Sequence, residues 1–324
     1  MLWNASPVGL IFFLLVDGLA VGEKKPSRQA ALRRYSVLSG ITYQDDCRQP
    51  PDGITIAERF SDNANGIIFK DDENKELVVA FRGSTFQDVA TDADFLIQAD
   101  YASPGISGCD ECKIHAGFLN SWNTVAKGVI SSVQGQLAEN PGLKVVVTGH
   151  SLGGALASLA GMSMVGSDIK ANVVTFGQPR TGNQAYADFV DKRIPGLIRV
   201  THADDIVPQI PPKNLASSGY QHHSTEVWQK SDAEAATTFQ CEGQEPDDCN
   251  LSVNPELKPD FNIIGNLSLG ELATGSAAHS NYLGVPMGSI FADEKLCGNA
   301  PNLLRDLGRG FIKLLKLSKR STEN

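Results

Sequence analysis

One stretch, residues 143–158, constrains the fold of this chain more than any other. A β-branched run at 145–147 leads into Gly149-His-Ser151-Leu-Gly153, and small residues of helical character follow. This pattern predicts a strand, a sharp turn with Ser151 at its apex, and a helix. Only glycine at positions 149 and 153 lets the strand and the helix approach without a Cβ clash. The Ser151 hydroxyl is therefore expected near the positive N-terminus of a helix. The alternative is a Gly-rich connection with an incidental serine.

Strand and helix patterns alternate from about residue 114 to residue 202. Helical patterns cover 31–43, 114–133, 154–162 and 185–193, and strand patterns cover 66–70, 76–81, 145–147, 171–176 and 196–202. The charged turn 71–75 predicts a hairpin between the first two strands. Such alternation implies βαβ crossovers, so we predict an α/β fold with a mostly parallel central sheet flanked by helices, in one domain. Residues 229–276 lack clear periodicity and are expected to form loops.

The N-terminus carries a short apolar core at residues 8–16, followed by the small residues Gly18 and Ala20. This core is too short to span a bilayer, and its flank is typical of a cleaved signal peptide. We therefore predict a signal peptide over residues 1–20 and a secreted, extracellular protein. An uncleaved anchor is the alternative.

The rest of the chain divides by charge. A basic stretch ending in Arg33-Arg34 predicts a possible propeptide over residues 21–34, or else a basic arm that stays attached. Residues 35–300 form the predicted domain, and residues 301–324 form a basic amphipathic tail. We expect this tail to dock on the acidic body or to be disordered, and the alternatives are binding to an anionic membrane surface and proteolytic removal. The net charge of −9 argues against a nucleic-acid partner.

Six cysteines fit an oxidising compartment and allow fifteen pairings. Short spacings suggest local loops for Cys109 with Cys112 and for Cys241 with Cys249, which leaves Cys47 and Cys297 to tie the ends of the domain together. A zinc site at Cys109 and Cys112 is disfavoured because no second ligand pair follows. Two sequons predict glycosylation at Asn250 and Asn266.

A serine hydroxyl needs a histidine base, which a carboxylate orients. On this topology the chain order is serine, acid, histidine. The strand pattern ending at residue 202 is followed by Asp204 and Asp205, which compete for the acid position. His279 lies nearest the C-terminus and is preferred to His222 and His223, which follow the acid too soon. The two oxyanion donors are expected at the N–H of Leu152 and at Ser84, where an early strand ends.

Several motifs in this order resemble the filamentous-fungal class 3 lipases. They are Val-Ala-Phe81-Arg-Gly-Ser84, His115-Ala-Gly-Phe118, Thr148-Gly-His-Ser-Leu-Gly-Gly-Ala155, Phe176-Gly-Gln-Pro-Arg-Thr-Gly-Asn183 and Thr201-His-Ala-Asp-Asp-Ile-Val-Pro. The family includes secreted triacylglycerol and partial-glyceride lipases and the type-A feruloyl esterases. The resemblance covers residues 30–297 and implies an α/β-hydrolase fold.

The resemblance also implies roles for individual residues. Ser151, Asp205 and His279 would form the catalytic triad, with Asp205 selected over Asp204 by the Asp-x-Val-Pro pattern. Ser84 and Leu152 would form the oxyanion hole. Cys47–Cys297 and Cys109–Cys112 match disulfides of the family, and Cys241–Cys249 resembles one found in the feruloyl esterases. No metal or organic cofactor is implied.

The expected lid departs from the lipase pattern. The segment after Ser84, which includes Thr85, Phe86, Val89 and Asp92, has no tryptophan and is rich in acid. Opening such a lid exposes little apolar area, so we predict weak interfacial activation.

The leading hypothesis is a secreted serine ester hydrolase acting on acylglycerols. Its expected partners are an ester or lipid substrate and a lipid–water interface, and we expect a monomer. The alternatives are a feruloyl-type or small-metabolite esterase and a catalytically silent surface-binding protein.

Overall fold

The computed structural model describes residues 28–84, 98–213, 219–231, 237–253, 277–288 and 296–297 of the 324-residue chain. Four predictions lie outside these residues. They are the signal peptide 1–20, the lid residues Thr85, Phe86, Val89 and Asp92, the sequon at Asn266, and the tail 301–324.

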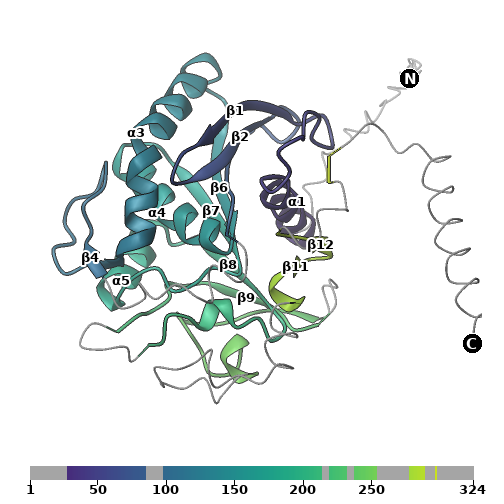
Figure 1. Cartoon of the computed structure of the whole chain (residues 1–324). Helices are drawn as coiled ribbons and strands as arrows, with labels where there is room; N and C mark the ends of the chain where they lie inside the picture. Colours follow the sequence, from purple (N-terminus) through teal and green to yellow (C-terminus); the bar gives the residue numbers. More distant parts are fainter. Residues whose placement is uncertain are drawn as a thin grey trace, which may run out of the picture.

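An eight-stranded sheet in the order β1-β2-β3-β6-β7-β8-β9-β10 forms the centre of the described residues (Figure 1). Its strands are β1 (Thr55–Ser61), β2 (Asn65–Asp71), β3 (Glu76–Phe81), β6 (Lys144–His150), β7 (Ala171–Phe176), β8 (Ile198–His202), β9 (Glu226–Gln229) and β10 (Thr238–Gln240). Pairing is parallel from β3 through β9 and antiparallel at both ends of the sheet. The predicted α/β fold with a mostly parallel sheet is confirmed.

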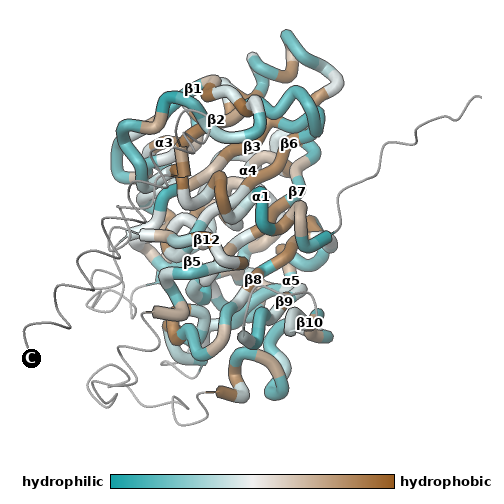
Figure 2. The backbone as a smooth tube through the Cα atoms, turned by 90° about the vertical axis from the view of Figure 1, so that its right-hand side faces the viewer, coloured by the Kyte–Doolittle hydropathy of each residue, from teal (hydrophilic) through white to brown (hydrophobic). Residues whose placement is uncertain are grey.

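Helices cover both faces of this sheet (Figure 1). They are α1 (Arg28–Ile41), α3 (Ala116–Glu139), α4 (Leu152–Gly166) and α5 (Gln184–Arg193). Alternate residues of β6 divide between the two faces. Val145 and Val147 pack in one core with α3, α4 and α5, whereas Val146 packs in another with α1. This division explains why the central strands read as continuous apolar runs, which is the pattern of parallel strands buried on both faces. Figure 2 shows the same concentration of hydrophobic residues along β3, β6 and β7.

Two short two-stranded sheets accompany the main sheet. One pairs β4 (Gln98–Asp100) with β5 (Lys113–His115), and the other pairs β11 (Asn281–Tyr282) with β12 (Val285–Pro286). The helix predicted to begin at residue 114 therefore begins two residues later, after a strand. Three strands of the main sheet, β1, β9 and β10, were missed by the sequence analysis. β10 lies in the segment expected to form loops, where three residues are too few to show a periodicity.

The predicted propeptide boundary conflicts with the first helix. Residues 28–34 form the first half of α1, and the Arg34 guanidinium pairs with the carboxylates of Asp71 and Glu76, at 2.6 Å for Glu76. The side chain of Asp71 is buried, so removal of Arg34 would leave it without this partner. Cleavage after Arg34 would remove the first half of α1, so these contacts favour the alternative of a basic arm that stays attached.

The six cysteines form three disulfides with the pairing implied by the resemblance. Cys47 bonds to Cys297, Cys109 to Cys112 and Cys241 to Cys249. The first bond joins residues 250 positions apart, so it ties the start of the domain to its end. Because Cys109 and Cys112 are bonded to each other, they do not ligate zinc.

Candidate active site

Ser151 lies at the sharp turn between β6 and α4. Its φ of 59° and ψ of −129° place a non-glycine residue in a strained region of backbone space. The surrounding sheet supports this conformation, because the Ser151 N–H donates to the carbonyl of Phe176 at 2.9 Å. The Ser151 carbonyl accepts from the N–H of Gly154 at 2.8 Å and so begins α4. The predicted strand, turn and helix are all present.

The two glycines that flank Ser151 are fixed by backbone contacts. A Cβ on Gly149 would lie 2.1 Å from the carbonyl oxygen of Gly153. A Cβ on Gly153 would lie 2.3 Å from the carbonyl oxygen of Phe81, on the neighbouring strand β3. Backbone atoms cannot move aside as a flexible side chain can. Glycine at both positions is therefore a steric requirement of the turn.

Asp205 and His279 form a buried hydrogen-bonded pair beside this turn. The Nδ1 of His279 lies 2.8 Å from the Oδ2 of Asp205, and both side chains are almost fully buried. Asp205 follows β8, at the carboxyl edge of the sheet, and the N–H of Val207 donates to its Oδ1 at 2.9 Å. With its Nδ1 proton directed at the carboxylate, His279 keeps the Nε2 lone pair for a second group.

Two further residues enclose this pair. The hydroxyl of Tyr282 donates to the same Oδ2 of Asp205, and burial raises the pKa of Tyr282, so this residue stays a donor. Gly177 has a φ of 55°, and a Cβ there would lie 2.7 Å from the Tyr282 hydroxyl and 3.0 Å from both Asp205 and His279. In the sequence, Gly177 only follows the strand pattern at 171–176, and nothing there indicates that its missing side chain makes room for the pair.

A chain of hydrogen bonds joins the early strand end to His279. The N–H of Gly83 donates to the Tyr43 hydroxyl at 3.1 Å, and that hydroxyl lies 2.8 Å from Nδ1 of His150. The Nε2 of His150 lies 2.7 Å from the carbonyl of His279. Burial is the main cause that lowers the pKa of His150 well below its usual value, and the nearby His279 lowers it further. A neutral His150 therefore donates from Nε2 and accepts from Tyr43 at Nδ1.

The predicted oxyanion residues lie at the same edge of the sheet. Parallel pairing sets Phe81 beside Gly149, and a Cβ on Gly83 would lie 3.0 Å from the Ser151 Cβ. Ser84 is the next residue and Leu152 is the first residue of α4, whose N–H belongs to the set that has no acceptor within the helix. The backbone segments that carry the two predicted donors therefore lie close to Ser151.

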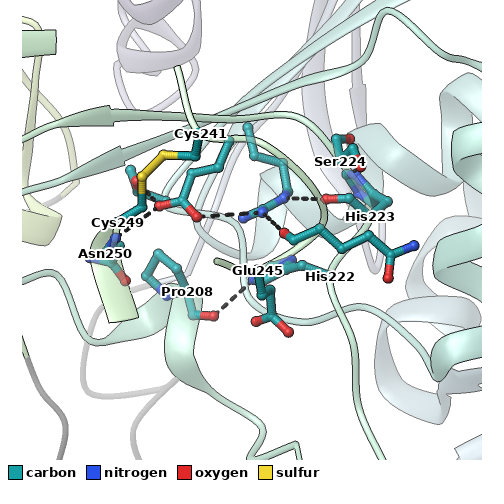
Figure 3. Close-up of polar contacts among 12 residues, drawn as sticks. Pro208, His222, His223, Ser224, Cys241, Glu245, Cys249 and Asn250 are labelled. Atoms are coloured by element: carbon teal, nitrogen blue, oxygen red, sulfur yellow. Dashed lines mark hydrogen bonds and ion pairs between the residues drawn. A yellow bond between two sulfur atoms is a disulfide. The ribbon is translucent and has the colours of Figure 1, made fainter. Parts of the chain in front are cut away.

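The other histidines considered as the catalytic base make hydrogen bonds away from Ser151. The Nε2 of His222 bonds to the carbonyl of Pro208 at 2.8 Å (Figure 3). The Nε2 of His223 lies 3.2 Å from the Ser158 hydroxyl. Burial lowers the pKa of His223 to about 3 and that of His222 well below its usual value. The carboxylate within hydrogen-bonding distance of the His279 Nδ1 is that of Asp205, the neighbour of Asp204.

The burial of the Asn250 side chain argues against the predicted glycan at this residue. The side chain is 3% exposed, and its amide nitrogen donates to the carbonyls of Ala203 and Asp205 at 3.2 and 3.1 Å. A glycan would be attached through this same buried nitrogen. Sequon matching missed this because burial depends on segments distant in the sequence.

Comparisons with known proteins place the chain in a family. The sequence model of the family described as Lipase (class 3) matches residues 78–215. Lipases from Rhizopus niveus and Rhizopus oryzae are each 35% identical over 278 residues, which cover 79% of this chain and 67% of each relative. The chain belongs to the class 3 lipase family. This confirms the resemblance stated from the motifs.

Other members of the class 3 lipase family agree with this placement. The secreted mono- and diacylglycerol lipase 1 of Fusarium solani is 38% identical over 165 residues, covering 50% of this chain and 46% of that protein. The crystal structure of a lipase from Rhizopus microsporus var. chinensis superposes with a TM-score of 0.67 at 32% identity, over 81% of this chain and 89% of that one. The fold is therefore the α/β-hydrolase fold of the fungal lipases.

The residues that the structure describes contain neither a cluster of metal ligands nor a membrane-spanning helix. No group of three or more His, Cys, Asp or Glu side chains there is arranged to hold a metal ion. No helix among those residues is long and apolar enough to cross a bilayer.

Proposed function

We propose that this class 3 lipase hydrolyses acylglycerol esters through a triad of Ser151, His279 and Asp205. The observation that supports the proposal most strongly is the buried Asp205–His279 pair, at 2.8 Å, beside a serine held in a strained turn between strand and helix. The chain order of the three residues is that of α/β-hydrolases.

Each residue of the triad has one task. Ser151 attacks the ester carbonyl, and His279 takes the proton of the Ser151 hydroxyl at Nε2. Asp205 holds the imidazole in one orientation and stabilises its charged form. His279 then gives the proton to the departing alcohol. Water hydrolyses the acyl-enzyme through the same histidine, and the free serine is restored.

The negative charge that develops on the carbonyl oxygen needs donors in place before the reaction. We assign this role to the N–H groups of Ser84 and Leu152, with the Ser84 hydroxyl as a further donor. The chain of hydrogen bonds from Gly83 through Tyr43 and His150 to the His279 carbonyl supports this assignment. These bonds connect the end of β3, next to Ser84, to His279. They therefore hold the predicted oxyanion donor and the base at a fixed distance from each other.

The names of the relatives support the proposed substrate class. The disulfides and the predicted signal peptide support the proposed extracellular location. Relatives from Fusarium and Penicillium are named secreted mono- and diacylglycerol lipases, and those from Rhizopus are named lipases. Three disulfides and the predicted signal peptide fit an extracellular enzyme. We propose that it acts as a monomer at a lipid–water interface. Light scattering of the purified protein tests whether it is a monomer.

A substrate panel with a serine variant tests the proposal. Wild-type protein is assayed on p-nitrophenyl esters, mono-, di- and triacylglycerols and methyl ferulate, and Ser151→Ala is assayed beside it. We expect hydrolysis of the acylglycerols and loss of all ester turnover in Ser151→Ala. Turnover that survives in the variant would refute the triad, whereas turnover of methyl ferulate alone would favour a feruloyl-type esterase.

Interfacial activation remains a separate prediction from the acidic lid sequence. We expect the rate on a short-chain ester to rise smoothly as its concentration passes the solubility limit, because little apolar area is exposed on opening. A steep jump at the limit would contradict this.

A further inference from the structure

A side chain outside the triad makes hydrogen bonds to the backbone of the turn that carries Asp205. The amide nitrogen of Asn250 donates to the carbonyl of Ala203 at 3.2 Å and to the carbonyl of Asp205 at 3.1 Å. These carbonyls lie on the two sides of Asp204, so one amide group fixes the peptide planes that lead into and out of the catalytic turn. Ala203 has a φ of 41°, a conformation that is costly for a residue with a Cβ. The turn therefore needs support from outside.

Asn250 is itself fixed on its remaining polar atoms. The side-chain amide of Gln209 donates to the Asn250 side-chain oxygen at 3.1 Å and to its backbone carbonyl at 3.0 Å. The Asn250 backbone N–H donates to Glu226 at 3.2 Å. Both amide hydrogens and the amide oxygen are thus in use in a buried site. Such a site distinguishes asparagine from most other residues, because a substitute leaves the buried Asp205 carbonyl without this donor.

The loop that carries Asn250 is clamped to the body of the protein. Cys249 precedes Asn250 and is bonded to Cys241, with 6.4 Å between their Cα atoms (Figure 3). Between the two cysteines, Arg180 pairs with Glu245 at 2.7 Å, and both side chains are about 3% exposed. Arg199 donates to the carbonyl of Gln244 at 2.7 Å. Two buried cations and one covalent bond therefore hold residues 241–250 in place.

We propose that Asn250 is a positioning residue for the catalytic carboxylate, and that the Cys241–Cys249 disulfide keeps Asn250 in register with the Asp205 turn. The proposal rests on the triad proposed above. The Asp205 side chain reaches His279 only while its own backbone turn is fixed. Without Asn250 the buried Asp205 carbonyl loses this donor, whereas the Ala203 carbonyl keeps the Trp228 indole N–H at 3.1 Å. The turn then relaxes on the side of Asp205. A displacement of about 1 Å at a reacting group is enough to cost up to about 100-fold in rate.

The same contacts explain why the sequon at Asn250 is not a modification site in the folded enzyme. A glycan on the amide nitrogen would remove one of its two donor hydrogens and would need space beside Asp205. Ser252, the third residue of the sequon, is exposed and its hydroxyl donates to the Cys249 carbonyl at 2.6 Å. It therefore supplies a matched control, since Ser252→Ala destroys the sequon without touching the Asp205 turn.

The test compares Asn250→Ala, Ser252→Ala and wild type on a soluble short-chain p-nitrophenyl ester, well below the melting temperature of each. We expect Asn250→Ala to lower kcat by about 10- to 100-fold, with KM within about two-fold of wild type. The rate constant of fluorophosphonate labelling of Ser151 should fall by a similar factor. Ser252→Ala should match wild type in kcat, KM and molecular mass. An Asn250→Ala enzyme that melts earlier yet keeps kcat within about two-fold would show a purely structural role and overturn the proposal.

A second variant decides the question if Asn250→Ala does not fold. Replacing both Cys241 and Cys249 by serine frees the loop and leaves Asn250 in the chain. We expect a smaller loss of kcat than in Asn250→Ala, about 3- to 10-fold, again at unchanged KM. Unchanged kcat in this variant would contradict the proposal. Failure of the triad itself is separable, since it would appear as ester turnover by Ser151→Ala in the presence of a normal Asn250.

Discussion

The two sides of the active site are held in place by different forces. Ser151 is positioned by backbone packing, since Gly149 and Gly153 bring a strand and a helix into contact between two parallel neighbours. Asp205 and His279 are positioned by buried polar side chains from distant segments, among them Tyr282 and Asn250. The serine side is a rigid steric construction. The acid side depends on hydrogen bonds, each of which can be removed singly, so the two sides should respond differently to mutation.

The largest effect is expected at the carboxylate. Asp205→Asn keeps the shape of the side chain but removes its charge and disturbs the tautomer of His279. We expect kcat to fall by about 10⁴-fold with the fold retained. The control is Asp204→Asn, at the neighbouring residue that also competed for the acid role, and it should keep most of the activity. The assay is ester turnover with circular dichroism of each variant. Equal losses in the two variants would contradict the assignment of Asp205.

The next effect concerns stability on the serine side. In Gly153→Ala a Cβ meets the backbone of Phe81 at 2.3 Å, so the strand–helix turn must open. We expect the free energy of unfolding to fall by about 3 kcal/mol or more, in the range of overpacked cores. The control is Gly128→Ala in α3, where a Cβ would meet nothing within 4 Å. It should stabilise the protein by about 0.5–1 kcal/mol. Denaturant unfolding measures both, and a tolerated Gly153→Ala would disprove the steric account.

A smaller, pH-dependent effect is expected on the acid side. Burial is the main cause that lowers the pKa of His222 well below its unfolded value of about 6.5, and the nearby Arg199 and Arg180 lower it further. As the pH falls below that value, the unfolded chain binds a proton that folded His222 does not. The folded state therefore loses about 1.4 kcal/mol per pH unit from this residue, and the contribution vanishes above the unfolded pKa.

The variant His222→Gln tests this linkage, because glutamine does not titrate. Its free energy of unfolding should fall less between pH 7.5 and pH 5.5 than that of wild type, by about 1.4 kcal/mol. His202→Gln is the control, at a half-buried histidine on β8. If the free energy of unfolding falls equally with pH in wild type and in His222→Gln, then His222 is not the cause of the loss of stability at low pH.

The smallest effect is expected at Tyr282. Tyr282→Phe removes one donor to Asp205 and leaves the Nδ1 of His279 and the N–H of Val207. Because these two donors remain, we expect a loss of about 1 kcal/mol, or about five-fold in kcat. Steady-state kinetics on a soluble ester measure it. A loss as large as that in Asp205→Asn would mean that Tyr282 takes part directly in the chemistry.

The same contrast explains how much the sequence could predict. The strand, turn and helix around Ser151 are coded by neighbouring residues, so a local pattern was enough. The parallel sheet followed from the alternation of strands and helices. Asp205 and His279 could be found because chain order in this fold is fixed, although they lie 74 positions apart.

The supports of Asp205 could not be predicted in this way. Asn250 looked like a glycosylation site because its triplet is a sequon, and only the contacts with Ala203 and Asp205 show that its amide nitrogen is occupied. Arg34 looked like the end of a propeptide because it follows another arginine. Its role depends on Asp71 and Glu76, which approach only when α1 packs on the sheet. Contacts of this kind leave no periodic signal.

The most direct test of the account is covalent labelling of the serine. A fluorophosphonate reacts with a serine only when a nearby base activates it, so the site of labelling identifies the nucleophile. Peptide mass spectrometry of wild-type protein should find one label per chain, on Ser151, and Ser151→Ala should remain unlabelled. A wild-type enzyme that hydrolyses esters while Ser151 stays unlabelled would contradict the central claim.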